Sequence, residues 1–196
     1  MSEIGENRIG LSSSPLELSR LQVLVVDDNL HMRKLIKTIL YALGIKGLRE
    51  ATDGAEALKE LKTFPADLVL TDWLMEPVDG IELVRQIRNG KNSTNEYLPV
   101  VMISGHSSRD AIIQARDAGV NEFLVKPISA KGLYQRIVSI IERPRPFVRT
   151  KSFFGPCRRR HNWSQYTGPE RRNLDENADG PMSQEDVNDL LDALDG

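Results

Sequence analysis

Several features that define large classes of protein are scarce in this sequence. It contains one cysteine, Cys157, so an intramolecular disulfide is excluded and cysteine alone cannot form a thiolate metal site. No apolar run approaches the roughly 18 residues that a membrane span needs. The first 20 residues have no basic start and no apolar core, so we do not expect a signal peptide. These absences predict a cytoplasmic protein without a membrane span.

Two adjacent segments near the C-terminus each lack charge of one sign. The chain of 196 residues has a net charge of −2. Residues 143–172 carry nine basic residues and a single acid, Glu170, whereas residues 173–196 carry eight acids and no basic residue. Charge separation of this kind is typical of interaction segments. We therefore divide the chain into a flexible N-terminus (1–20), a folded domain (21–142), an arginine-rich segment and an acidic tail.

The folded domain alternates apolar, β-branched runs with segments of helical periodicity. Strands are predicted at 21–26, 47–52, 66–72, 98–104 and 121–126, and helices at about 35–43, 55–61, 81–87, 108–118 and 129–142. Continuous apolar runs such as LQVLVV at 21–26 are typical of strands that are buried on both faces. Strict alternation of strand and helix predicts an α/β fold, a doubly wound five-stranded parallel sheet with right-handed crossovers.

The composition changes at Arg143, and the Pro-Arg-Pro at 144–146 ends the last helix of the domain. Apolar residues are sparse beyond it, so we expect residues 143–181 to be disordered in the free chain. Two short sequences in this segment are near-repeats, FGPCRR at 154–159 and TGPERR at 167–172. The acidic tail has one apolar face, which predicts a short amphipathic helix. This face consists of Val187, Leu190, Leu191 and Leu194.

Acidic residues stand at the carboxyl ends of two predicted strands. Asp27 and Asp28 follow the first strand and Asp72 ends the third, while Ser104 and Lys126 end the fourth and fifth. The reactive site of an open parallel sheet lies at this edge. Converging carboxylates repel one another unless a hard cation joins them, and Mg²⁺ prefers such oxygen ligands. An aspartate there can act as a nucleophile that forms an aspartyl phosphate, with the lysine beside the phosphoryl oxygens.

These motifs resemble the receiver domain of bacterial response regulators, the CheY-like family. The matching elements are VVDDN at 25–29, LTDW at 70–73 with Asp-Gly at 79–80, Ser104, and Lys126–Pro127. The spacing agrees as well, with nineteen residues from Ser104 to Phe123 and three from there to Lys126. The resemblance covers about residues 20–142. It implies a flavodoxin-like receiver fold. The implied domain catalyses its own phosphotransfer and dephosphorylation and is otherwise not an enzyme. Its implied partner is a histidine kinase or phosphotransfer protein.

The resemblance also implies roles for single residues. Asp72 is the phosphoacceptor, and Lys126 pairs with the phosphoryl group. Ser104 is the switch hydroxyl and Phe123 the switch aromatic. The ligands of Mg²⁺ are Asp28, Asp72 and the backbone carbonyl of Leu74, while Asp27 acts on the ion mainly through water. Two positions depart from the family pattern. Glu76, followed by Pro77, stands where a proline is usual, and Phe123 replaces the commoner tyrosine. Phe123 fits a plain core position equally well.

The arginine-rich segment contains eight arginines and one lysine, and it repeats an aromatic–x–Gly-Pro-x-Arg-Arg pattern. Arginine is favoured where planar stacking and forked hydrogen bonds are both needed, and guanine offers O6 and N7 to such a fork. Two half-sites suit a ligand with two guanines, cyclic di-GMP. The segment resembles that of the CheY-like Cle proteins, which bind cyclic di-GMP. The candidate ligand-binding residues are Arg145, Arg149, Arg158, Arg159, Arg160, Trp163, Tyr166, Glu170, Arg171 and Arg172.

The acidic tail resembles the extreme N-terminus of the flagellar switch protein FliM, over MSQEDVNDLLDAL at 182–194. Three interpretations remain open: a generic terminal helix, a mimic that docks on its own or a related receiver, and an electrostatic cover over the arginine-rich segment. The whole sequence predicts a response regulator that is phosphorylated on Asp72, binds cyclic di-GMP and acts by protein contact, at the flagellar motor or a surface-attachment machinery. The alternative is a phosphorelay shuttle whose basic tail binds no small ligand, or binds nucleic acid nonspecifically.

Overall fold

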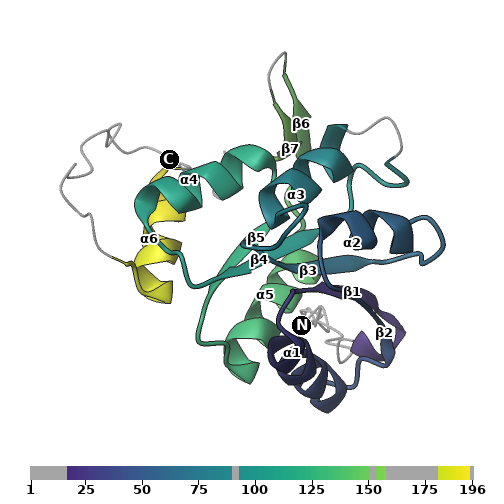
Figure 1. Ribbon diagram of the computed structural model, residues 1–196. Helices are drawn as coiled ribbons and strands as arrows, with labels where there is room; N and C mark the ends of the chain where they lie inside the picture. Colours follow the sequence, from purple (N-terminus) through teal and green to yellow (C-terminus); the bar gives the residue numbers. More distant parts are fainter. Residues whose placement is uncertain (1–16, 90–92, 151–152, 158–180, 195–196) are drawn as a thin grey trace, which may run out of the picture.

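The computed structural model describes residues 17–89, 93–150, 153–157 and 181–194. Its centre is a five-stranded parallel sheet, which confirms the predicted doubly wound fold (Figure 1). The strands are β1 (Gln22–Val26), β2 (Gly47–Ala51), β3 (Leu68–Asp72), β4 (Val100–Ser104) and β5 (Glu122–Val125). Their order in the sheet is β2-β1-β3-β4-β5, so β2 and β5 are the edge strands.

Five helices connect these strands. They are α1 (Leu30–Ala42), α2 (Gly54–Glu60), α3 (Gly80–Asn89), α4 (Arg109–Ala118) and α5 (Ala130–Glu142). All five follow a residue whose side chain accepts a hydrogen bond from the first turn, including Asp79 before α3. The other four are Asn29, Asp53, Ser108 and Ser129. The cap at Asn29 starts α1 earlier than the apolar stripe from residue 35 predicted.

The two faces of the sheet bury two apolar cores. Side chains alternate between the faces along each strand, so in β1 Val23 and Val25 belong to one core, whereas Leu24 and Val26 belong to the other. Helices α1 and α5 cover the first core, and α2, α3 and α4 cover the second (Figure 1). Because both faces are covered, polar side chains that act on a ligand collect at the carboxyl edge of the sheet. Regular structure is already present before residue 21, since Leu18–Arg20 forms a 3₁₀ turn that buries Leu18.

A hairpin follows α5, inside the segment for which the composition predicts disorder. Strands β6 (Phe147–Arg149) and β7 (Phe154–Pro156) pair antiparallel. The rings of Phe147 and Phe154 lie 5.2 and 5.3 Å from the ring of Tyr97 on the receiver side. This aromatic cluster offsets the ordering entropy of so short a hairpin. Disorder is therefore the wrong prediction for these two strands, while residues 158–180 lie outside the described part of the chain.

Two glycines let the hairpin approach the domain closely. Gly119 ends α4 in the left-handed region, at φ 99°, where other residues are strained. A β-carbon on Gly155 of β7 would lie 3.0 Å from the α-carbon of Gly119. The backbones therefore meet here almost without intervening side chains.

The predicted terminal helix is present as α6 (Gln184–Leu194), which packs beside α4 (Figure 1). Val187, Leu190 and Leu191 are buried in the core that α4 covers. The side chain of Leu194 is outside the described part. No helix among the described residues is long and apolar enough to cross a membrane.

Candidate functional site

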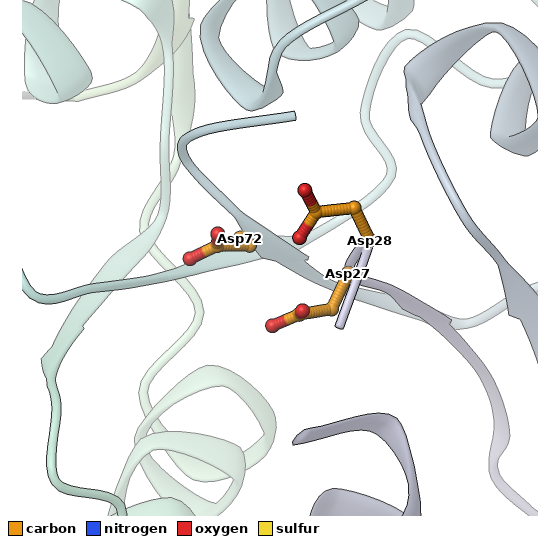
Figure 2. A group of neighbouring side chains, drawn as sticks. All are labelled: Asp27, Asp28 and Asp72. Atoms are coloured by element: carbon orange, nitrogen blue, oxygen red, sulfur yellow. The ribbon is translucent and has the colours of Figure 1, made fainter. Parts of the chain in front are cut away.

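Three carboxylates converge at the carboxyl edge of the sheet, as Figure 2 shows. Asp27 and Asp28 follow β1, and Asp72 is the last residue of the neighbouring strand β3. One ligand oxygen from each lies within 4.8 Å of the others. Asp27 is buried and Asp28 is exposed. The cluster therefore has an inner wall and an open side.

The turn after β1 fixes the direction of the Asp27 side chain. The backbone N–H of Asn29 donates to Asp27 Oδ1 at 2.8 Å. Arg33, one turn into α1, donates from Nη1 to the carbonyl oxygen of Asp27 at 2.7 Å. The same short segment that caps α1 thus directs the Asp27 carboxylate toward β3.

Lys126 joins two of the carboxylates. Its Nζ lies 2.8 Å from Asp72 Oδ1 and 3.3 Å from Asp27 Oδ2. Burial opposes its charge, but the hydrogen bond and attraction of Asp72, followed by those of Asp27, outweigh burial and raise the pKa of Lys126. The pKa of Asp27 is raised, chiefly because burial disfavours its anion, against the lowering contributions of Asn29 and Lys126. The site therefore keeps a fixed ammonium between two carboxylates.

The loop after β3 folds back tightly over the strand end. The N–H of Gly80 donates to the carbonyl oxygen of Trp73 at 2.9 Å. A β-carbon at Gly80 would lie 2.1 Å from the carbonyl oxygen of Asp72, so only glycine fits here. This turn places Leu74, whose side chain is exposed, directly after the cluster. Its carbonyl as a metal ligand remains a prediction.

The two predicted switch residues lie on neighbouring strands, Ser104 on β4 and Phe123 on β5. Ser104 ends β4, is buried, and accepts a hydrogen bond at Oγ from the N–H of His106 at 3.0 Å. Phe123 of β5 is also buried, and its ring meets the ring of Trp73 edge to face at 6.5 Å. Phe123 also shares a core with α6. Both interpretations of Phe123, core residue and switch, are compatible with this position.

The donor set fits a hard divalent cation. Three carboxylate oxygens close together, one of them on an exposed residue, are the ligands that Mg²⁺ takes, with water completing its octahedron. Among the described residues, this is the one acidic cluster with metal-binding spacing.

Comparison with known proteins agrees with this geometry. The family model described as "Response regulator receiver domain" matches residues 23–138, more than half of the chain. The chain belongs to the response regulator receiver family. It is 41% identical over 123 residues to the chemotaxis protein CheY-3 of Vibrio cholerae, covering 63% of this chain and 93% of that protein. The same identity and length hold for CheY of Pseudomonas aeruginosa, 98% of which is covered.

Solved structures show the same receiver fold. The receiver domain of the Francisella response regulator 1452 is 32% identical, with a TM-score of 0.56, over 63% of this chain and 98% of that one. A CheX–CheY–BeF3–Mg²⁺ complex from Borrelia burgdorferi contains a chain that is 28% identical, with a TM-score of 0.56, over 62% of this chain and 89% of that one. The matched family region ends at residue 138, so the hairpin and α6 lie outside it.

A buried arginine of the receiver was missed by the sequence analysis. Arg88 of α3 has no exposed surface. It donates to the carbonyl oxygens of Gly119 at 3.0 Å, Glu96 at 3.0 Å and Leu98 at 2.7 Å, and to Asn121 Oδ1 at 2.9 Å. Burial lowers the pKa of Arg88 to about 9, so it stays charged at neutral pH. A signal existed, because residue 88 continues the apolar stripe of α3 at helical spacing.

Two of the predicted ligand-binding arginines lie in the described part of the hairpin region, Arg145 at its base and Arg149 next to its turn. Arg145 donates to the carbonyl oxygens of Asn121 and Cys157, so it ties the hairpin to the receiver. Arg149 Nη2 lies 2.8 Å from Glu96 Oε2, and its guanidinium stacks 3.9 Å above the ring of Phe154. The other eight predicted residues lie outside the described part of the chain: Arg158, Arg159, Arg160, Trp163, Tyr166, Glu170, Arg171 and Arg172.

Proposed function

We propose that the protein is a response regulator whose receiver accepts a phosphoryl group on Asp72 from a histidine kinase or a phosphotransfer protein. The observation that carries this proposal is the contact of Lys126 Nζ with Asp72 Oδ1 at 2.8 Å, beside Asp27 and Asp28. Receivers of this family bind Mg²⁺ at such an acidic cluster. In this chain Asp28, Asp72 and the carbonyl of Leu74 would hold the ion, which neutralises charge on the phosphoryl oxygens when bound.

The transfer needs one nucleophile and one fixed cation from the protein. A carboxylate oxygen of Asp72 attacks phosphorus of a phosphohistidine, the phosphorus–oxygen bond forms and the phosphorus–nitrogen bond breaks. The electron pair of that bond returns to the imidazole nitrogen, which then takes a proton. Lys126 stays protonated, because its pKa is raised, and it holds an oxygen of the transferred group. Water attack on the same phosphorus restores the carboxylate and releases phosphate.

Acetyl phosphate with Mg²⁺ provides the test. We expect the wild-type chain to gain the mass of one phosphoryl group, labile to acid and hydroxylamine, and Asp72→Asn to gain none. Asp53→Asn is the matched control, since Asp53 caps α2 away from the cluster and asparagine caps equally well. Equal labelling of Asp72→Asn and wild type would disprove the assignment of the phosphoacceptor.

A second proposal concerns the ligand of the arginine-rich segment, for which we propose cyclic di-GMP. The repeated Gly-Pro-x-Arg-Arg supports it, and so does the position of the first copy. Phe154–Pro156, which opens that copy, is strand β7 and is packed on the receiver. The arginines 158–160 therefore start from a fixed anchor. A shuttle whose basic segment binds no small ligand and a nonspecific nucleic-acid binder are the competing functions.

We also propose that the output is a protein contact. The flagellar switch protein is the proposed partner class, on the likeness of residues 182–194 to its N-terminus. Pull-down with purified flagellar switch protein, with and without a phosphodonor, tests it. Binding that is absent under both conditions would remove this partner.

A further inference from the structure

The outer edge of the sheet at β5 is covered by a side chain of α6. The N–H of Lys126 donates to the carbonyl oxygen of Ser104 on β4. Peptide groups alternate in direction along a strand, so the N–H of Val125 and the carbonyl of Phe123 point outward. Gln184 Oε1 accepts from the N–H of Val125 at 2.7 Å, and its Nε2 donates to the carbonyl of Phe123 at 3.2 Å.

These two bonds reproduce the pairing of a neighbouring parallel strand. A residue of such a strand accepts from one residue of its partner and donates to the residue two positions earlier. The amide of Gln184 does the same with Val125 and Phe123, so a single side chain caps an edge that has no partner strand. A side-chain amide presents an acceptor and a donor side by side on one planar group, which this pairing uses.

Contacts on both sides of Gln184 hold the helix in place. Before it, the N–H of Met182 donates to the carbonyl of Ser107, and Ser107 Oγ donates to the carbonyl of Met182 at 2.6 Å. One turn after it, Asn188 Oδ1 accepts from Arg136 Nη2 of α5 at 2.6 Å. The helix therefore bridges the loop after β4, the edge of β5 and the face of α5.

The apolar face of α6 completes the contact. Val187 has no exposed surface, and Leu190 and Leu191 retain 6% and 5%. They share a core with Phe123 and with Ile112 of α4. An apolar face of this kind, left uncovered, would attract a partner.

We propose that α6 is an intramolecular occupant of this surface, recognised through Gln184, and that any helical partner of the surface must displace it. The proposal does not depend on phosphorylation of Asp72, and its test uses no phosphodonor. Residues 158–180 join the hairpin to α6, so the helix is covalently tethered to the receiver that it covers. The effective concentration of the tethered helix is then on the order of 1 mM.

A peptide of residues 181–196 serves as the probe in solution. It is titrated by fluorescence anisotropy against the full chain and against a chain that ends at residue 180. The shortened chain retains the whole receiver, and CheY relatives of which 93–98% is covered consist of little else. For a peptide Kd of about 100 µM on the shortened chain, competition at an effective 1 mM predicts about tenfold weaker binding to the full chain.

Variants of the full chain isolate the role of the amide. Gln184→Ala removes both hydrogen bonds to β5, which weakens docking by about tenfold or more. Peptide binding to this variant should recover to within about twofold of the shortened chain. Glu185→Gln is the matched control, because Glu185 is the exposed neighbour on the same helix, and it should bind the peptide as weakly as the wild-type chain.

Hydrogen exchange at the amide of Val125 gives a readout that needs no peptide. Exchange should be faster in Gln184→Ala and in the shortened chain than in wild type and Glu185→Gln, and independent of protein concentration. Equal exchange in all four chains, equal peptide affinity for the full and shortened chains, or no peptide binding to the shortened chain up to about 1 mM would each overturn the proposal. Protection that grows with protein concentration would overturn it too, by assigning the docked helix to a second copy.

Discussion

The receiver and the C-terminal extension are held together in different ways. The receiver buries two continuous apolar cores on the faces of its sheet, and many residues contribute to each. The extension depends on a few residues with individual roles: Arg145 and Phe147 in the hairpin, Gln184 and Val187 in α6. Periodic burial tolerates single changes that keep volume and polarity. The polar attachments through Arg145 and Gln184 do not, because each unmatched group costs its own desolvation.

Replacing Arg88 should have the largest effect, because this residue serves both regions. Arg88→Met leaves the carbonyls of Gly119, Glu96 and Leu98 without their donor, and it removes the cation under the ring of Phe147. We expect unfolding in urea to show a loss of at least about 3 kcal/mol. The exposed Arg85→Met in the same helix should change stability by less than about 0.5 kcal/mol. A similar small change in both variants would contradict the importance of this network.

The proposed ligand gives an intermediate effect, confined to the extension. Each forked contact between arginine and guanine contributes about 1–3 kcal/mol. Arg171→Ala or Arg172→Ala should therefore weaken cyclic di-GMP binding at least several-fold, and more than Arg143→Ala, in calorimetric titrations. Titration at two salt concentrations, with single-stranded RNA as competitor, separates a guanine site from charge alone. Equal losses from all three variants, with strong dependence on salt, would favour the nucleic-acid alternative.

The smallest expected effect is a loss of stability at low pH, at the Asp186 carboxylate in the first turn of α6. The Ser183 hydroxyl and N–H donate to Asp186 Oδ2, at 2.6 and 2.9 Å, and these bonds lower the pKa of Asp186 below its ordinary 3.8. A lowered pKa in the folded state contributes stability above pH 3.8, which is lost as the pH falls through the lower folded-state value. Carboxyl NMR should give an Asp186 midpoint below 3.8 in the full chain. In Ser183→Ala the midpoint should rise, and an unchanged midpoint would show that the capping bonds do not form.

The receiver could be predicted from sequence because its signals are repeated. Five strands and five helices each carry an apolar period, and the edge at which Asp27, Asp72 and Lys126 meet follows from the direction of a parallel sheet. The hairpin could not be found this way, because three residues per strand carry no period. Its order comes from a ring cluster with Tyr97, far away in the chain.

Single-residue attachments escaped prediction for a related reason. Nothing in the sequence around Gln184 distinguishes an amide that pairs with a strand edge from a solvated one. The apolar face from Val187 was predicted, but the surface that it covers depends on the tertiary position of α4. Arg88 had a visible signal in its helical spacing, yet its acceptors are backbone carbonyls that no sequence pattern identifies.

The close approach of Gly155 to Gly119 has a consequence for sequence variation. Because main chain meets main chain there, the anchor of the hairpin depends little on which side chains its outer surface carries. Homologous chains could carry other side chains on this outer surface and so prefer another ligand, while the hairpin stays packed on the domain. The two glycines, together with Arg145 and the ring cluster of Phe147 and Phe154, would thus set the limit within which the outer side chains of the hairpin are free to diverge.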